Sequence, residues 1–156
     1  MALSIGSQVP DLTLKTLSAE GLVDVSLRSH VGQAPFVVLF FPAAFTGVCT
    51  QEMCDISKGL PGFGDIKVYG ISPDAPFAQA AWAKQEGITT TLLSDYQRAA
   101  AQAFDVVLPD LAGLGPGSKR AAFLVAQDGT IKYSEETATP GDLPNFAALA
   151  EAIKSL

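Results

Sequence analysis

Residues 36–54 read FVVLFFPAAFTGVCTQEMC, and this stretch decides the fold class of the chain. Its first part, Phe36–Phe41, is a continuous apolar run of aromatic and β-branched residues, which is typical of a strand buried on both faces. Pro42 ends the run, and the residues from about Gly47 to Lys58 have the pattern of a helix. The stretch therefore predicts a buried strand that leads through a short loop into a helix, as in α/β proteins.

Strand and helix patterns alternate on both sides of this stretch. The Asp128-Gly129 turn between the last two β-prone segments predicts a hairpin. Earlier in the chain, Ser94 is the expected N-cap of the helix that begins at the next residue. Further strands are expected at Leu12–Lys15, Val23–Ser26, Ile66–Ile71, Thr91–Leu93, Ala121–Val125 and Thr130–Ser134, and further helices at Pro76–Glu86, Asp95–Phe104 and Leu143–Leu156. Together these segments predict an α/β layered domain with a mixed sheet.

Length and composition limit the classes of protein to which the chain can belong. Its 156 residues match one domain, at about 150 residues per domain, so we expect residues 1–156 to form a single unit. Apolar residues make up 48% and charged residues 17%, which excludes a disordered acidic tail. The net charge of −6 argues against a broad nucleic-acid-binding surface.

The sequence indicates no membrane partner and no export. The longest apolar stretch, Ala34–Phe45, is too short to span a bilayer and is interrupted by Pro35 and Pro42. The first residues, MALSIGSQVPDL, lack the basic and apolar segments of a secretory signal. We therefore expect a cytoplasmic protein, in which thiols are kept reduced.

The chain has two cysteines and one histidine, which make a poor set of zinc ligands and no disulfide scaffold. In a reducing compartment, such a cysteine pair points to catalysis or redox sensing rather than to a structural role. We therefore expect no metal site.

Cys49 stands at the start of the helix that follows the buried strand. If Thr46 is the N-cap, Cys49 is the third helical residue, near free N–H groups and the positive end of the helix dipole, which favour a thiolate. A helix terminus supplies only about 0.3–1 kcal/mol, whereas lowering a thiol pKa by two units takes roughly 2.7 kcal/mol. A reactive Cys49 therefore requires a nearby cation. The alternative is that Cys49 fills the core as a small apolar residue.

The spacing of Cys49 and Cys54 can be tested geometrically. Five residues along a helix separate their Cα atoms by roughly 8.7 Å, whereas a disulfide needs less than about 7 Å. The two cysteines therefore cannot bond while the helix is intact, and a bond would couple the redox state to local unwinding. The absence of a C-x-x-C motif argues against a dithiol carrier of the thioredoxin kind.

Pro42, Thr46 and Cys49 fill the pattern P-x-x-x-T-x-x-C, and the segment resembles the active-site signature of the peroxiredoxins. The similarity is greatest to the alkyl-hydroperoxide-reductase-E-like and bacterioferritin-comigratory (Q-type) branches. It extends over most of the chain, through Phe40-Phe41-Pro42, Ile71-Ser72-Pro73-Asp74, Ala81-Trp82-Ala83, Leu93-Ser94-Asp95, Lys119–Val125 and Asp128–Ile131. The resemblance implies a thioredoxin-like fold and a thiol-dependent peroxidase that needs no metal, haem or flavin.

The same resemblance implies roles for single residues. Cys49 would be the peroxidatic cysteine, whose thiolate attacks one peroxide oxygen and becomes a sulfenic acid. Thr46 would hydrogen-bond the peroxide. Arg120 would supply the missing cation and stabilise charge on the leaving oxygen, and Glu52 would orient Arg120.

Two further features of the signature complete the implied site. Pro42 would shield the thiolate from water, and the main-chain N–H groups of Val48 and Cys49 would complete the oxygen-binding cradle. Cys54 matches the resolving position of some Q-type members, which unwind the helix to close a Cys49–Cys54 disulfide.

The resemblance also implies substrates and partners. The expected substrates are hydrogen peroxide and organic hydroperoxides, the expected reductant is of the thioredoxin or glutaredoxin type, and the expected assembly is a homodimer. Two alternatives remain open: a one-cysteine cycle that is resolved by an external thiol, and a non-enzymatic redox sensor.

Overall fold

The apolar run Phe36–Phe40 forms β3, all five residues of which are buried. It is an interior strand of a seven-stranded sheet in the order β2-β1-β5-β4-β3-β8-β9. The computed structural model describes residues 1–156. The other strands of this sheet are β1 (Thr13–Ser18), β2 (Gly21–Ser26), β4 (Lys67–Ser72), β5 (Thr91–Ser94), β8 (Ala121–Val125) and β9 (Ile131–Glu136). Because β3 pairs in parallel with β4 and antiparallel with β8, the expectation of a mixed sheet is confirmed.

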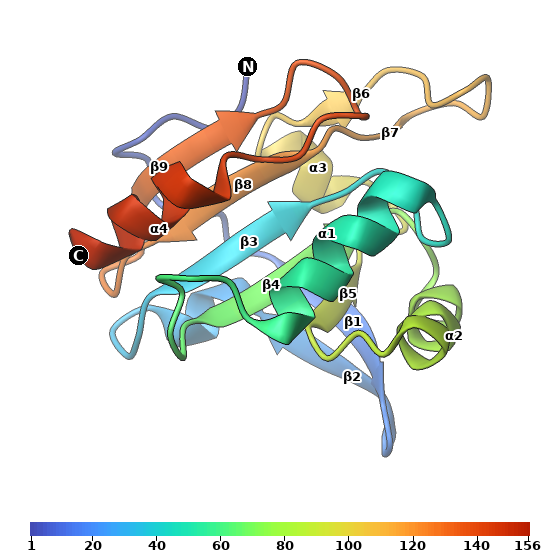
Figure 1. Ribbon diagram of the computed structural model, residues 1–156, viewed down its shortest axis with the longest axis horizontal. Helices are drawn as coiled ribbons and strands as arrows, with labels where there is room; N and C mark the ends of the chain where they lie inside the picture. The colour runs from blue at the N-terminus through green and yellow to red at the C-terminus, as the bar shows by residue number, and fades with distance from the viewer.

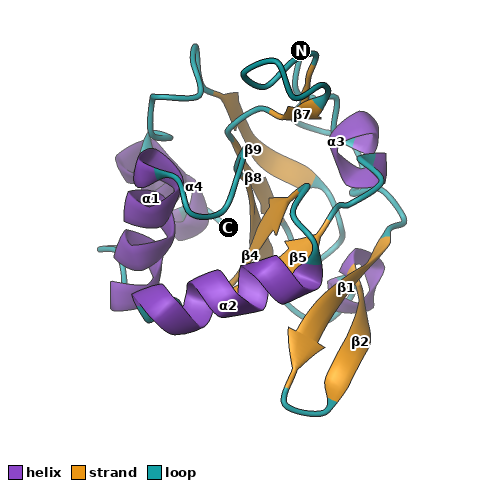
Figure 2. Cartoon of the chain, turned by 90° about the vertical axis from the view of Figure 1, so that its right-hand side faces the viewer, coloured by secondary structure: helices purple, strands orange, loops and turns teal.

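Helices cover both faces of the sheet (Figures 1 and 2). One face carries α1 (Gly47–Lys58), α2 (Pro76–Glu86) and α4 (Phe146–Lys154), and the other carries the short α3 (Ala99–Ala103). A 3-10 turn, η1 (Leu27–His30), and a small ribbon of β6 (Val107–Leu108) and β7 (Gly117–Ser118) complete the structure.

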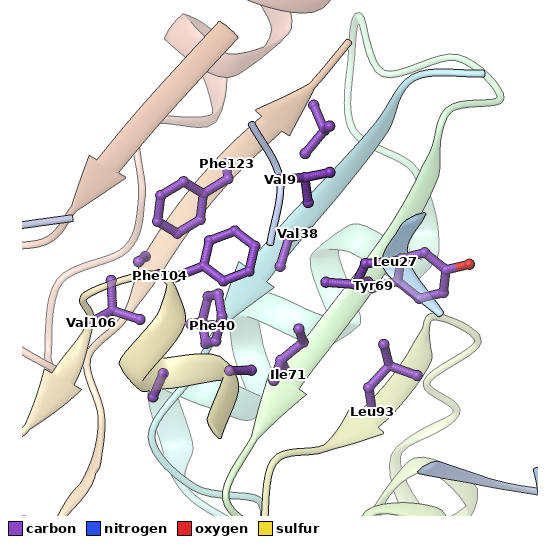
Figure 3. Close-up of a cluster of buried hydrophobic side chains, with 14 of the residues drawn as sticks. Val9, Leu27, Val38, Phe40, Tyr69, Ile71, Leu93, Phe104, Val106 and Phe123 are labelled. Carbon is purple, nitrogen blue, oxygen red and sulfur yellow. The ribbon is translucent and has the colours of Figure 1, made fainter. Parts of the chain in front are cut away.

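Alternate residues of β3 supply the two halves of the core. Val37 and Leu39 pack with α1, α2 and α4. Phe36, Val38 and Phe40 face the other side, where Figure 3 shows Phe40 beside Phe123 of β8, Ile71 of β4 and Phe104, which directly follows α3. A strand buried on both faces is expected to be apolar at every position, which accounts for the unbroken run in the sequence.

The region around β3 follows the sequence prediction most closely. Helices α1 and α2 and strand β8 begin and end at the predicted residues, and β8 and β9 form the predicted hairpin around Gly129. Gly87 takes the left-handed conformation that ends α2, with a φ of 70°.

Two helices are shorter than predicted. Helix α3 begins at Ala99 rather than Asp95, and the predicted cap at Ser94 is wrong because Ser94 is the last residue of β5. The carboxylate of Asp95 instead accepts hydrogen bonds from the N–H groups of Ala100 and Ala101, both at 2.8 Å. Helix α4 begins at Phe146 rather than Leu143, after the Asn145 cap, whose side chain accepts a hydrogen bond from the N–H of Ala148.

One glycine brings α1 close to the sheet. A Cβ atom at Gly70 of β4 would lie 2.8 Å from Cδ2 of Leu92 and 3.1 Å from Sδ of Met53. Met53 is fully buried on the sheet-facing side of α1. The missing side chain therefore lets the helix that carries both cysteines pack directly on β4.

Candidate active site

Cys49 lies in the first turn of α1, where the chain enters the helix from β3 (Figure 1). Its side chain is only 1% exposed. The first helical hydrogen bond runs from the N–H of Thr50 to the carbonyl of Thr46, so the N–H groups of Gly47, Val48 and Cys49 donate to no other protein atom. The sulfur is therefore attached to a helix start that offers free donors and a positive dipole end.

Thr46 occupies the N-cap position of α1, but its side chain makes no capping hydrogen bond. Its hydroxyl instead donates to the carbonyl of Ala43 at 2.7 Å. Because the hydroxyl proton is committed to this bond, the lone pairs of the oxygen are available to accept a hydrogen bond from a bound molecule.

Arg120, the residue before β8, brings a buried cation to Cys49. One terminal nitrogen, Nη2, donates to Sγ of Cys49 at 3.1 Å, and the other, Nη1, forms a salt bridge with Oε2 of Glu52. Arg120 is 2% exposed. Because an arginine side chain presents five donors in a fixed plane, it contacts the sulfur and the carboxylate at the same time. The structure thus brings Cys49, Glu52 and Arg120 together.

A fourth group holds Arg120, and sequence reasoning missed it. The carbonyl of Pro140 accepts hydrogen bonds from Nε at 3.2 Å and from Nη2 at 2.9 Å. The N–H of Thr137 also donates to the Arg120 carbonyl at 3.0 Å. A main-chain acceptor in a loop leaves no side-chain signature, so no sequence pattern could have indicated it.

Glu52 stands one turn after Cys49 and is fully buried. Burial raises the pKa of this carboxyl from 4.5 to about 7, although the charge and hydrogen bond of Arg120 act in the opposite direction. Oxygen Oε1 has no hydrogen-bond partner. For Arg120, burial by itself lowers the pKa, but the negative charges of Glu52 and Cys49 outweigh it and raise the pKa.

The pKa of Glu52 makes the stability of the fold depend on pH. Between pH 4.5 and about 7 the folded state binds more protons than the unfolded state. The free energy of unfolding should therefore fall as the pH rises through this range, by about 3 kcal/mol in total. We expect Glu52→Gln to flatten this slope in urea unfolding at pH 5, 6, 7 and 8. The control is Glu151→Gln at an exposed carboxylate, and equal slopes in the wild type and Glu52→Gln would contradict the assignment.

Cys54 lies apart from this group of side chains. It is half-buried, and its sulfur donates to the carbonyl of Glu86 at the end of α2, at 3.7 Å. Both cysteines are free, and α1 is unbroken between them. Pro42 is buried at the start of the loop, and Val48 is half-buried in the first turn.

Cys54 belongs to a line of polar contacts between α1 and the α2 region, which we call the α1–α2 seam. Its α1 residues are spaced four and three apart and so share one helix face. The seam consists of three hydrogen bonds. Trp82 Nε1 donates to Thr50 Oγ1 at 3.1 Å, Cys54 Sγ donates to the carbonyl of Glu86, and the main-chain N–H of Thr89 donates to Ser57 Oγ at 2.9 Å. The seam therefore fixes α1 along its length in the helical state.

Comparisons with known proteins point to one family. The AhpC/TSA family model matches residues 5–134. The chain is 32% identical to the thiol peroxidase of Bacillus subtilis, over 97% of this chain and 87% of that protein. It is also 32% identical to alkyl hydroperoxide reductase E of Mycobacterium tuberculosis, over 99% of this chain and 98% of that protein.

Solved structures agree in fold. AhpC of Mycobacterium tuberculosis superposes with a TM-score of 0.83 at 26% identity, over 99% of this chain and 93% of that chain. Peroxidoxin BcpB of the same organism superposes with a TM-score of 0.81 at 26% identity, over 99% of this chain and 98% of that chain. None of the helices has the length and apolar character needed to cross a bilayer.

Proposed function

The chain belongs to the AhpC/TSA family of peroxiredoxins, and from this premise we propose that Cys49 is the residue that reduces the peroxide. The expected thioredoxin-like fold and the expected class of enzyme, a thiol-dependent peroxidase, are confirmed. The observation that carries the assignment of Cys49 is the 3.1 Å contact from Arg120 Nη2 to its sulfur in the first turn of α1.

The arrangement of these groups supports the following first step. The Cys49 thiolate attacks the hydroxyl oxygen of a hydroperoxide, a sulfur–oxygen bond forms and the oxygen–oxygen bond breaks. The electron pair goes to the leaving oxygen, which takes a proton and departs as water or an alcohol, and Cys49 becomes a sulfenic acid. Arg120 stabilises the thiolate before the step and the leaving oxygen during it.

The remaining groups of the site act on the peroxide. The Thr46 hydroxyl, whose proton is held by Ala43 O, accepts a hydrogen bond from the peroxide O–H. The unoccupied N–H groups of Val48 and Cys49 donate to its oxygens. Pro42 screens the thiolate from water, and Glu52 keeps Arg120 directed at the sulfur.

We propose that Cys54 resolves the sulfenic acid. Its thiolate attacks the Cys49 sulfur, hydroxide leaves and becomes water, and a disulfide forms. Because the Cα atoms are roughly 8.7 Å apart in an intact helix, part of α1 must unwind and the Cys54–Glu86 contact must break. A thioredoxin- or glutaredoxin-type dithiol then reduces the disulfide.

Cys54→Ser tests the resolving step. One equivalent of hydrogen peroxide is mixed with the reduced protein, the emission of Trp82 follows the reaction, and mass spectrometry identifies the product. We expect wild type to lose two hydrogens, mapped to Cys49 and Cys54. The variant should oxidise at a similar first rate, because Cys54 is outside the Arg120 site, but should retain a sulfenic acid that an added thiol can trap.

The result separates the two possible cycles. A sulfenic acid that persists in wild type would contradict resolution by Cys54 and favour the one-cysteine cycle with an external thiol. A wild-type rate no greater than that of a free thiol would contradict the assignment of Cys49. The curated relatives are named as enzymes, which favours turnover over the redox-sensor alternative.

Substrates, assembly and location complete the proposal. The substrates are hydrogen peroxide and organic hydroperoxides. A homodimer is supported by exposed aromatic side chains: Phe77 is 61% and Tyr96 64% exposed, and both line one surface hollow with Leu22. A cytoplasmic location, a homodimer and the class of reductant stay predictions.

A further inference from the structure

The segment Ile71-Ser72-Pro73-Asp74 has no part in the mechanism above, yet it touches the loop that precedes Cys49. Oxygen Oδ2 of Asp74 accepts a hydrogen bond from the main-chain N–H of Ala44 at 2.8 Å. The same oxygen accepts a second bond from the hydroxyl of Ser72 at 2.7 Å. The Asp74 carboxylate therefore links the carboxyl end of β4 to the middle of the β3–α1 loop.

Buried polar side chains hold Asp74 in place. The hydroxyl of Ser94, in β5, donates to the Asp74 carbonyl at 2.7 Å. The amide of Gln79, in α2, donates to Ser72 Oγ at 2.8 Å and to the carbonyl of Leu93 at 2.9 Å. Ser72, Gln79 and Ser94 are 0%, 2% and 8% exposed. A buried and interconnected network of this kind fixes the position of its members.

The loop needs such a support. Phe45 follows Ala44 with a φ of 63°, a left-handed conformation that costs roughly 1–2 kcal/mol for a residue other than glycine. Strained residues of this kind persist where surrounding contacts determine them. The neighbouring Ala43 supplies the carbonyl that orients the Thr46 hydroxyl. The Asp74–Ala44 bond thus lies at the point where the loop turns toward Thr46 and the helix start.

We propose that Asp74 is a positioning residue for the peroxide-reducing step. By holding the N–H of Ala44, it sets the loop so that the Thr46 hydroxyl and the first N–H groups of α1 face one peroxide molecule at the Cys49 sulfur. Asp74 has no hydrogen bond to Cys49 or Arg120, so it acts on the position of the peroxide and not on the thiolate. The proposal rests on the proposed function of Cys49.

The test compares two reactions of the same sulfur, so every protein in it also carries Cys54→Ser, which leaves Cys49 as the only thiol. Hydrogen peroxide needs the positioned loop, whereas iodoacetamide needs only an accessible thiolate. For Asp74→Ala we expect the second-order rate with hydrogen peroxide to fall roughly 10- to 100-fold, as for reacting groups displaced by about 1 Å. The iodoacetamide rate should stay equal or rise. Asp74→Asn keeps an acceptor oxygen at the same place and should restore most of the peroxide rate.

A matched control separates positioning from general loosening of the fold. Asp95→Ala removes a buried carboxylate, the one that caps α3 and has no hydrogen bond to the loop. We expect it to lower the thermal midpoint while leaving the ratio of peroxide to iodoacetamide rates unchanged.

Three outcomes would overturn the proposal. The first is that Asp74→Ala reacts with hydrogen peroxide at the wild-type rate. The second is that its peroxide and iodoacetamide rates fall by the same factor. The third is that Asp95→Ala changes the ratio of these two rates as much as Asp74→Ala does. Failure of the proposed function looks different, because then the unsubstituted protein itself would react with peroxide no faster than a free thiol.

Discussion

Cys49→Ser is expected to abolish peroxide consumption, with a first-step rate at least about 1,000-fold below that of wild type. A serine hydroxyl is not ionised at neutral pH, so the substituted site contains no nucleophile of comparable strength. Cys54 cannot replace it, because its sulfur is bound at the end of α2, away from Arg120. The measurement is peroxide consumption with dithiothreitol as reductant, together with the single-turnover change in Trp82 emission.

The fold of this variant should survive. Serine is slightly smaller than cysteine, and its oxygen can accept the Arg120 hydrogen bond, so the thermal midpoint should remain within a few degrees of wild type. Retained turnover in a folded Cys49→Ser protein would show that another thiol attacks the peroxide and would overturn the assignment.

Arg120→Met is expected to produce the second largest loss. The helix start alone stabilises a thiolate by about 0.3–1 kcal/mol, and Arg120 is the only cationic side chain with a hydrogen bond to the Cys49 sulfur. Removal of one such donor from a reaction centre typically lowers a rate by about 100- to 1,000-fold. We expect a loss of this size in the second-order rate with hydrogen peroxide, measured by stopped flow from the change in Trp82 emission.

Two further variants isolate the cause of this loss. Arg120→Met leaves Glu52 buried without its partner, which destabilises the fold. The double variant Arg120→Met/Glu52→Gln removes this unpaired carboxylate, so its peroxide rate shows the effect of losing Arg120 in a folded protein. Arg120→Lys keeps the charge but cannot reach Cys49, Glu52 and the Pro140 carbonyl at once, so its rate should fall between those of wild type and Arg120→Met. A wild-type rate in the double variant would exclude Arg120 from the chemistry.

The parts of the fold that the sequence predicts best are those encoded by neighbouring residues. The unbroken apolar run of β3, the proline at the start of α2 and the Asp128-Gly129 turn each fix their element locally. The start of α3 was predicted wrongly because Asp95 caps N–H groups five and six residues further along the chain. No helical periodicity reveals a cap at that distance.

The same distinction holds for the site. Thr46, Cys49 and Glu52 lie within seven positions of one another, and one helix start gathers them. Helix geometry predicts only that Cys49 needs a cation, and the resemblance to a family is what points to Arg120, 71 positions away. The Pro140 carbonyl and the Asp74–Ala44 bond depend on how distant loops meet at the carboxyl ends of the strands, which local sequence does not encode.

The α1–α2 seam bears on the energetics of electron transfer. In the proposed cycle, α1 unwinds between Cys49 and Cys54, which breaks the Cys54–Glu86 contact and also moves Thr50, which lies between the two cysteines, away from Trp82. The free energy of these contacts is recovered when the disulfide is reduced, so it raises the reduction potential by about 30 mV for each 1.4 kcal/mol. The packing of two helices thereby makes the disulfide a stronger oxidant and favours transfer of electrons to it from an external dithiol.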